Sequence, residues 1–247
     1  GLRSHIFEVV RKTEVQIESE GILSDGIRLF PRAVPVKIFR IFRTRFRSID
    51  DIFKEIDKYR TLLNVLGEEH IALSEEFLVD YRSGKERRTL LCGLQEYISG
   101  DILDPWRVAG PQSIEQMLAT MTGSQSPPVK RALDQTASFL SRIRKMILDH
   151  GLIPDLAGVG NLILTPRGEL RLVDINNIVP IAFSPEIPLD DKDYPSCDVS
   201  VQVLIMLEKK LLGNPADSGD PLFRHFLDRH RRRRVKTLEK RFYDRIN

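Results

Sequence analysis

Apolar residues in the first part of the chain come in short runs that are typical of β-strands. Four segments, HIFEVV, VQIES, IRLF and VPVKIFRIF, are rich in Val, Ile and Phe, and Gly21, Gly26, Pro31 and Pro35 interrupt them. Alternation of apolar and polar positions, broken by Gly and Pro, predicts extended structure with turns between the strands. We therefore expect a β-sheet in the segment that extends up to Arg47.

The pattern then changes to the 3.6-residue period of a helix. Ser48 stands as N-cap, acidic residues fill the first turn and Gly67 ends the segment, which together define a helix over residues 48–66. Its apolar positions are Ile49, Ile52, Phe53, Ile56, Tyr59, Leu63 and Leu66. The next segment, EEFLVDYRSGKERRTLLCGLQEYISGD, predicts two strands joined by a polar turn at Ser83 and Gly84.

Helical patterns dominate after residue 125. A helix capped by Ser126, with Pro127 in its first turn, is expected to end at Gly151. The segments NLILT and LRLVD form a hairpin around the turn PRGE, and CDVSVQVLIMLEKKLLG predicts a helix that is apolar on nearly all sides. A basic helix follows near the end. We expect an α+β fold with a β-rich lobe over residues 1–98 that holds one long helix, a connector near residues 95–104, and a mainly helical lobe over residues 99–247.

Composition and charge narrow the class of protein. The chain has 247 residues, and 38 Lys and Arg nearly balance 35 Asp and Glu, so net charge does not by itself indicate a nucleic-acid or membrane partner. Only Cys92 and Cys197 are present, too few for a disulfide framework or a zinc site made of cysteines. The sequence has no apolar run that could span a bilayer and no leader pattern, so a cytoplasmic location is expected.

Three polar residues around the hairpin are candidates for metal and proton chemistry. Asp155 precedes a Gly-rich loop, Asn161 begins the first hairpin strand and Asp174 ends the second. Magnesium prefers oxygen ligands and usually shares them with phosphate oxygens, so Asn161 and Asp174 suit a nucleotide–Mg²⁺ site. Asp155 would be a second carboxylate able to accept a hydroxyl proton. Alternatively, Asp155 and Asn161 are turn-forming residues of the loop.

The stretch from 153 to 177 resembles the catalytic segment of the protein-kinase-like superfamily. In that family a loop Asp precedes an Asn, a hairpin follows, and a further Asp binds metal. The interval of thirteen residues from Asn161 to Asp174 is similar to the family's usual one. The resemblance implies ATP and Mg²⁺ as cofactors, Asp155 as the catalytic residue, and Asn161 and Asp174 as metal ligands.

The same resemblance extends towards the start of the chain. VPVKIF looks like the strand that carries the nucleotide-binding lysine, which implies that Lys37 binds phosphate and that Glu55 on the capped helix is its ion-pair partner. LQEYISGDILD is similar to the interlobe hinge, which implies that backbone groups of Glu96 and Ile98 bind adenine. Asp198 matches the acid that braces the catalytic loop. Arg40 and Arg43 lie on the same extended segment and compete with Lys37 for this role. The alternative is that these basic side chains are simply solvated.

Several departures from the family pattern keep a second function open. The interval from Asp155 to Asn161 is six residues where the family has five, DIN replaces Asp-Phe-Gly, and no Gly-rich strand-turn-strand precedes Lys37. One hypothesis is therefore an ATP- and Mg²⁺-dependent phosphotransferase that acts on an unidentified hydroxyl acceptor, either a small molecule or a protein. The other is a pseudokinase that serves as a binding or scaffolding module.

The basic run RHRRRRVKTLEKRF suggests a third, weaker hypothesis. Clustered arginines neutralise nucleic-acid phosphates, but acidic residues interleave this segment, so a solvated helix face is the favoured interpretation. Trp106, the only Trp, is expected to be a packing anchor that follows the hinge.

Overall fold

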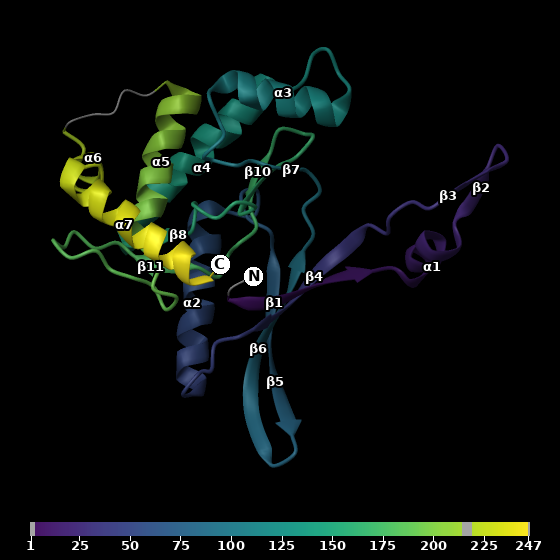
Figure 1. The fold of residues 1–247 in the computed structure, drawn as a ribbon, viewed down its shortest axis with the longest axis horizontal. Coiled ribbons are helices and arrows are strands. Elements are labelled where there is room, and N and C mark those ends of the chain that lie inside the picture. The colour runs from purple at the N-terminus through teal and green to yellow at the C-terminus, as the bar shows by residue number, and fades with distance from the viewer. Residues whose placement is uncertain (1–2, 214–218, 247) are drawn as a thin grey trace. The chain divides into compact units, whose positions relative to one another are not determined.

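The computed structural model describes residues 3–213 and 219–246 and contains both helices and sheets within them (Figure 1). The chain divides into two compact units. The first comprises residues 1–57 and 72–97, and the second comprises residues 58–71 and 98–247. The expected mixture of α and β structure is confirmed.

An antiparallel four-stranded sheet forms most of the first unit. Its strands lie in the order β1 (Ser4–Val10), β4 (Pro35–Phe42), β6 (Glu86–Glu96) and β5 (Ser74–Ser83). The first half of α2 (Ile49–Leu66) packs on one face of this sheet, where Phe42, Ile52 and Leu91 form a small buried cluster. Ser48 Oγ accepts a hydrogen bond from Asp51 N at 3.2 Å, and Gly67 closes the helix with φ +78°. The predicted helix and both of its ends are confirmed.

Residues 15–19 do not form the strand that their Val and Ile predict. They belong to helix α1 (Lys12–Glu20), which has no buried residue, and a short hairpin of β2 (Ile22–Ser24) and β3 (Ile27–Leu29) follows it. Side-chain pairs on the helix favour this conformation, including Gln16 with Glu20 at 3.1 Å. Glu18 also accepts from Ala33 N at 3.1 Å, which attaches the helix to the following segment.

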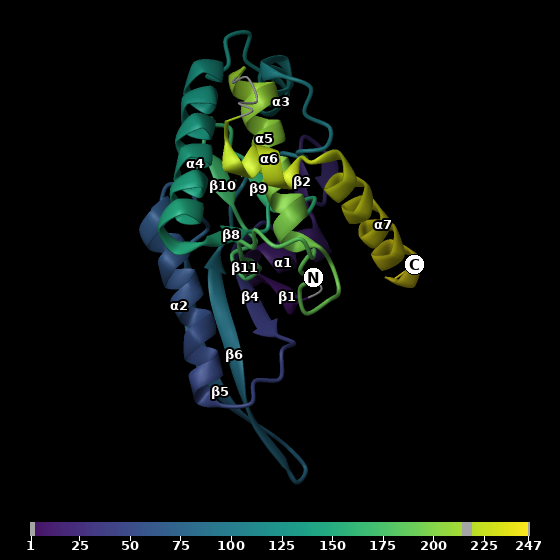
Figure 2. The same ribbon diagram turned by 90° about the vertical axis from the view of Figure 1, so that its left-hand side faces the viewer.

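The second unit is built around two long helices. Its elements are β7 (Asp101–Ile102), α3 (Pro111–Thr122), α4 (Val129–His150), β8 (Leu152–Pro154), β9 (Leu162–Leu164), β10 (Leu170–Leu172), β11 (Ile178–Pro180), α5 (Ser196–Leu212), α6 (Pro221–Phe226) and α7 (Arg229–Ile246). Helix α4 packs on α5, β8 and β10, and Figure 2 shows these elements side by side. The PRGE hairpin, the buried helix and the basic helix are confirmed.

Two features of the helical part were not predicted correctly. Helix α4 begins at Val129 after an N-cap at Pro128, so the expected cap at Ser126 is wrong. Ser126 instead donates its backbone N–H to Ser124 Oγ at 3.1 Å, which makes it part of a turn before the helix. Helices α3 and α6 were not anticipated.

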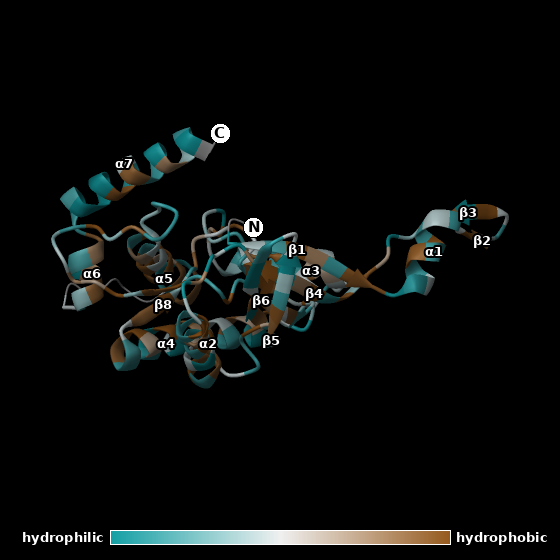
Figure 3. Cartoon of the chain, turned by 90° about the horizontal axis from the view of Figure 1, so that it is seen from below, coloured by the Kyte–Doolittle hydropathy of each residue, from teal (hydrophilic) through white to brown (hydrophobic). Residues whose placement is uncertain are grey.

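Buried polar contacts join the elements of the second unit. His70 is fully buried, with Nε2 at 3.0 Å from Ser138 Oγ and Nδ1 at 3.4 Å from Leu170 O. Asp198 accepts two hydrogen bonds from Arg231, at 2.5 Å from Nε and 2.9 Å from Nη2. Arg231 is therefore an interior residue, although most of the basic run on α7 is solvent-exposed, as expected (Figure 3). Within the described residues, none of the helices has the length and apolar character needed to cross a membrane.

Candidate functional site

The three candidate residues of the second unit gather at the ends of two short antiparallel strand pairs, β8 with β11 and β9 with β10. Asp155 directly follows β8, and Asn161 directly precedes β9. Strand β8 pairs with β11 and strand β9 pairs with β10, both antiparallel, so their adjacent ends bring distant parts of the sequence together. Asp174 lies two residues after β10, and the bond from Val173 N to Asn161 O, 2.8 Å long, holds this end of the ladder closed.

The carboxylate of Asp155 is fixed by donors on both of its oxygens. Ala157 N donates to Oδ1 at 2.9 Å, and Asn177 Nδ2 donates to Oδ2 at 3.1 Å. The Asp155 backbone N–H also donates to Asn177 O at 2.8 Å. Each carboxylate oxygen keeps a further acceptor position, so Asp155 can still accept a hydrogen bond from a hydroxyl group.

Asn161 is arranged so that its amide oxygen is available. Its Nδ2 donates to Asp155 O at 3.0 Å, and Oδ1 has no hydrogen-bond partner in the described part of the chain. A Cβ on Gly158 would lie only 2.6 Å from Asn161 Nδ2, so the glycine at 158 provides the space for this carboxamide. Gly160 adopts φ +97°, a conformation that favours glycine, and completes the turn from 158 to 161.

Neighbouring elements of the same unit brace the loop. Ser200 Oγ on α5 accepts from Leu156 N at 3.2 Å, and Trp106 Nε1 donates to Ala157 O at 3.0 Å. Trp106 is thus an anchor of this loop, although 46% of its surface is exposed. Asp198, the acid expected to brace the loop, forms an ion pair with Arg231, whereas Ser200 is the residue of α5 that accepts a hydrogen bond from the loop.

The oxygen atoms at this edge fit Mg²⁺ better than a transition metal. No group of three or more His, Cys, Asp or Glu that could hold a metal occurs within residues 3–213 and 219–246. The candidate ligands are the Asp174 carboxylate and the Asn161 carboxamide, and Mg²⁺ is commonly held by one or two carboxylates together with phosphate oxygens. Asn177 Oδ1 is buried and lacks a partner among the described residues, so the edge also offers an acceptor to a ligand.

The first unit holds Lys37 and Glu55, the other predicted pair. Lys37 and Arg40 lie on opposite faces of β4, because successive side chains of a strand alternate. Arg40 shares its face with Phe42 and therefore with α2, whereas Lys37 makes no ion pair with any described residue. Glu55 on α2 acts electrostatically on Glu76.

A buried ion pair occupies the face of the sheet that α2 covers. Arg40 Nη2 donates to Glu76 Oε1 at 2.7 Å and to Ser74 Oγ at 2.9 Å, and both charged side chains are nearly inaccessible. Gly93 lies between them on β6, where a Cβ would approach Glu76 Oε2 to 2.8 Å. Burial raises the pKa of Glu76, and the nearby Glu55 acts in the same direction while Arg40 opposes it.

Glu96 and Ile98 lie where β6 leaves the sheet. Glu96 is the last residue of β6, pairs with Lys37 in the ladder, and donates its backbone N–H to Leu73 O at 2.7 Å. Ile98 follows in the irregular segment that leads to β7. Neither position has been tested as an adenine ligand, and both remain predictions.

Two features of these sites were not identified from the sequence. Asn177 stands in the run DINN, where three polar residues after an apolar strand could have indicated a second carboxamide beside Asn161. Arg40 and Glu76 carry no comparable signal, because their pairing depends on the register of β5 on β6 and of β6 on β4.

Comparisons with known proteins give a distant likeness. No family model and no curated protein matches the chain. Among solved structures, the chain is similar to one described as the ROP18 kinase domain in complex with AMP-PNP and sucrose, at 10% identity and a TM-score of 0.36, over 89% of this chain and 63% of that one. It is also similar to ROP2 from Toxoplasma gondii, described as a virulence factor with a protein-kinase fold and no enzymatic activity, at 14% identity and a TM-score of 0.33, over 68% of this chain and 54% of that one. The chain thus spans less than two thirds of either neighbour, and function has to be argued from its own side chains.

Proposed function

We propose that the chain is an ATP- and Mg²⁺-dependent phosphotransferase with a two-lobed, kinase-like fold that acts on a hydroxyl acceptor. The observation that carries the proposal is the group of polar residues at the ends of β8, β9 and β10. There Asn177 orients Asp155, and Asn161, whose amide oxygen has no partner within the described residues, lies next to the strand end that leads to Asp174. The order of the other elements supports it. A lysine-bearing strand, a capped helix, two strands, a connector and the polar hairpins follow one another as the resemblance implies. The proposed lobes divide between residues 98 and 99.

Each residue at the edge has a defined role in this proposal. Asn161 and Asp174 hold Mg²⁺ through oxygen atoms, and the metal, when bound, neutralises charge on the nucleotide phosphates. Asp155 accepts a hydrogen bond from the acceptor hydroxyl and takes its proton as the new oxygen–phosphorus bond forms and the bond between the γ-phosphorus and the bridging oxygen breaks, so that ADP leaves. Asn177 holds the Asp155 carboxylate in one orientation, so less ordering is required when the acceptor arrives.

The residues proposed to bind the nucleotide in the first unit and the connector have less support from the structure than those proposed to bind Mg²⁺. Lys37 and Glu55 remain the predicted phosphate-binding pair, and the backbone groups of Glu96 and Ile98 remain the predicted adenine ligands. Arg40 lies on the α2 side of the same strand and forms a salt bridge with Glu76. The Arg40–Glu76 pair is therefore a second candidate for the ion pair of this unit that the resemblance implies.

Thermal unfolding with nucleotide tests the metal site directly. ATP is expected to raise the melting temperature more with Mg²⁺ than with EDTA, since a ligand that binds only the native state stabilises it by mass action. Asp174→Asn should abolish most of the Mg²⁺-dependent part, because one ligand charge is lost. Asp149→Asn, on an exposed part of α4, is the control and should keep the parent response. A Mg²⁺-dependent shift that survives Asp174→Asn would place the metal elsewhere.

A catalytically impaired module is the second candidate function. Lys37 has no carboxylate partner among the described residues, and the buried carboxylate of Glu76, on the edge strand β5, is bound to Arg40. If this function is correct, ATP will stabilise the protein equally with and without Mg²⁺, or not at all. The nucleic-acid hypothesis loses support, because Arg231 of the basic run is buried against Asp198.

A further inference from the structure

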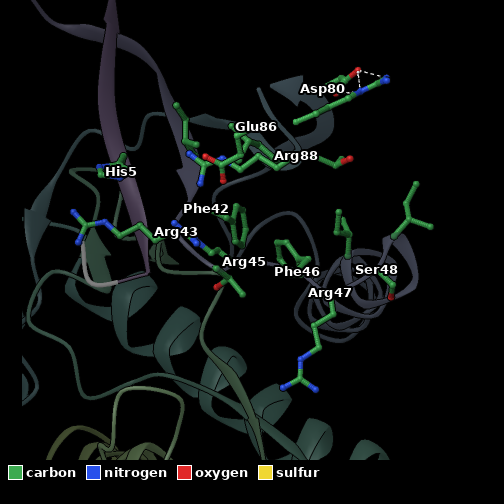
Figure 4. A pocket seen from close by; sticks show the side chains of 17 residues that line it. His5, Phe42, Arg43, Arg45, Phe46, Arg47, Ser48, Asp80, Glu86 and Arg88 are labelled. Carbon is green, nitrogen blue, oxygen red and sulfur yellow. Dashed lines mark hydrogen bonds and ion pairs between the residues drawn. The ribbon is translucent and has the colours of Figure 1, made fainter. Parts of the chain in front are cut away.

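A large hollow opens on the first unit, on residues that the proposed function does not use. It has a volume of about 1140 Å³ and lies between the end of β4, the segment that leads to α2, and the outer part of the β5–β6 hairpin (Figure 4). Its lining belongs entirely to the first unit. The residues that carry the argument are Phe42, Arg43, Arg45, Phe46, Arg47 and Arg88.

Arginines supply most of the charge around the hollow. Arg43, Arg45 and Arg47 alternate along one extended segment, are solvent-exposed, and form no ion pair with any residue that the structure describes. Arg88 lies 5.2 Å from the centre of the Tyr81 ring, and its Nε is buried without a hydrogen-bond partner within the described ranges. These four side chains therefore have donors left for an anionic ligand.

The other charged residues of the lining do not cancel the positive charge of these four arginines. Arg87 and Asp80 neutralise each other through a contact of 2.5 Å, and Glu86 is the only other carboxylate that lines the hollow. Ser48, the N-cap of α2, also lines the hollow, whereas the two acidic residues of that helix's first turn, Asp50 and Asp51, do not. The net charge of the hollow is positive.

Apolar side chains form the inner part of the hollow. Phe42 is 7% exposed, and its ring lies 6.4 Å from that of Phe46, centre to centre. Ile52 is fully buried, whereas Phe46 and Leu90 are half-buried and Ile49 is 52% exposed. An anion alone would leave Phe46 and Ile49 exposed, so a ligand that fits the whole hollow has an apolar group beside its negative charge.

We propose that this hollow, the Arg43–Arg88 pocket, docks a phosphorylated peptide segment. The phosphate would bind the guanidinium groups of Arg43, Arg45 and Arg88, which present paired donors suited to phosphate oxygens. An aromatic or aliphatic side chain next to the phosphorylated residue would cover Phe46 and Ile49. A concave site with this lining fits a peptide better than a lipid surface, which contacts exposed convex parts of a protein.

Fluorescence anisotropy of the full chain with a labelled pentapeptide, Gly-Phe-phosphoserine-Phe-Gly, tests the proposal. The phosphopeptide is expected to bind at least ~10-fold tighter than its unphosphorylated twin, because charge-assisted hydrogen bonds to the phosphate are lost in the twin. Raising NaCl from about 50 mM to about 300 mM should weaken binding, since exposed charges are screened. Equal affinity for both peptides would overturn the proposal.

Matched variants distinguish binding in this pocket from non-specific electrostatic attraction to the protein. The double variant Arg43→Ala/Arg45→Ala should lose at least ~10-fold in affinity for the phosphopeptide. Arg32→Ala/Arg82→Ala removes the same charge from exposed positions outside the lining and should stay within about twofold of the parent. Equal losses in both variants would show only non-specific attraction and would overturn the proposal. Binding to phosphatidylserine vesicles that needs Arg43 and Arg45, without binding to the peptide, would assign the pocket to a membrane surface instead.

Discussion

At the scale of single residues, the ion pair between Asp198 and Arg231 is expected to contribute strongly to stability. Both side chains are almost inaccessible, so removing one partner leaves a buried charge without compensation. Arg231→Ala should lower the free energy of unfolding by about 3–5 kcal/mol. Arg232→Ala, at the next and exposed position, should change it by less than about 0.5 kcal/mol. Urea denaturation of both variants measures these changes. If Arg231→Ala lowers the free energy of unfolding as little as Arg232→Ala, the ion pair contributes no more than a surface residue.

A second prediction at this scale concerns the pH dependence of stability. Burial lowers the pKa of His70 below its ordinary value of 6.5, so the folded chain takes up a proton at His70 less readily than the unfolded chain does. The unfolded state therefore binds more protons below pH 6.5, and stability should fall as the pH decreases through that value. His70→Gln should reduce this loss between about pH 7.5 and about pH 5.5 in urea denaturation. His5→Gln, at an exposed position, should leave it unchanged.

At the scale of elements, the loop from Asp155 to Asn161 depends on the missing side chain at Gly158. Gly158→Ala would bring a Cβ to 2.6 Å from Asn161 Nδ2, so the carboxamide has to move from its bond to Asp155 O. We expect the Mg²⁺-dependent part of nucleotide stabilisation to be lost while the melting temperature without ligand changes by only a few degrees. Val159→Ala, at a 65% exposed position in the same turn, is the control. An unchanged response in Gly158→Ala would show that Asn161 is no ligand.

The elements also show which structures local sequence can predict. Helix α2 was predicted with both ends, because its caps and apolar stripe act locally. Helix α1 was not, since its Val and Ile favour strands and its stability comes from polar pairs and from contacts near Ala33. The same limit applies to the sites. Asp155, Asn161 and Asp174 follow from spacing along one segment, whereas the Arg40–Glu76 pair follows only from strand register.

At the scale of the whole molecule, burial is distributed unevenly, and local stability should follow it. Helix α5 has twelve buried residues, whereas α1 has none, and the hairpin of β2 and β3 is exposed throughout. Figure 3 shows that part of this hairpin is apolar, and Leu23 is 69% exposed. Segments with little burial open locally at a small free energy, while those in the core exchange their amide hydrogens only through larger openings.

Hydrogen exchange followed by mass spectrometry tests this difference. After correction for intrinsic rates, the amides of α1, β2 and β3 should exchange at least ~10²-fold faster than those of α5. Glu18→Gln weakens the bond to Ala33 N and should accelerate exchange in α1 further, without an effect on α5, because the two helices belong to different units. Lys12→Gln, at an exposed position of the same helix, keeps that bond and the Gln16–Glu20 pair and is the control. Protection of α1 equal to that of α5 would contradict the argument, because it would mean that a partner or a second copy of the chain covers the apolar residues left exposed here.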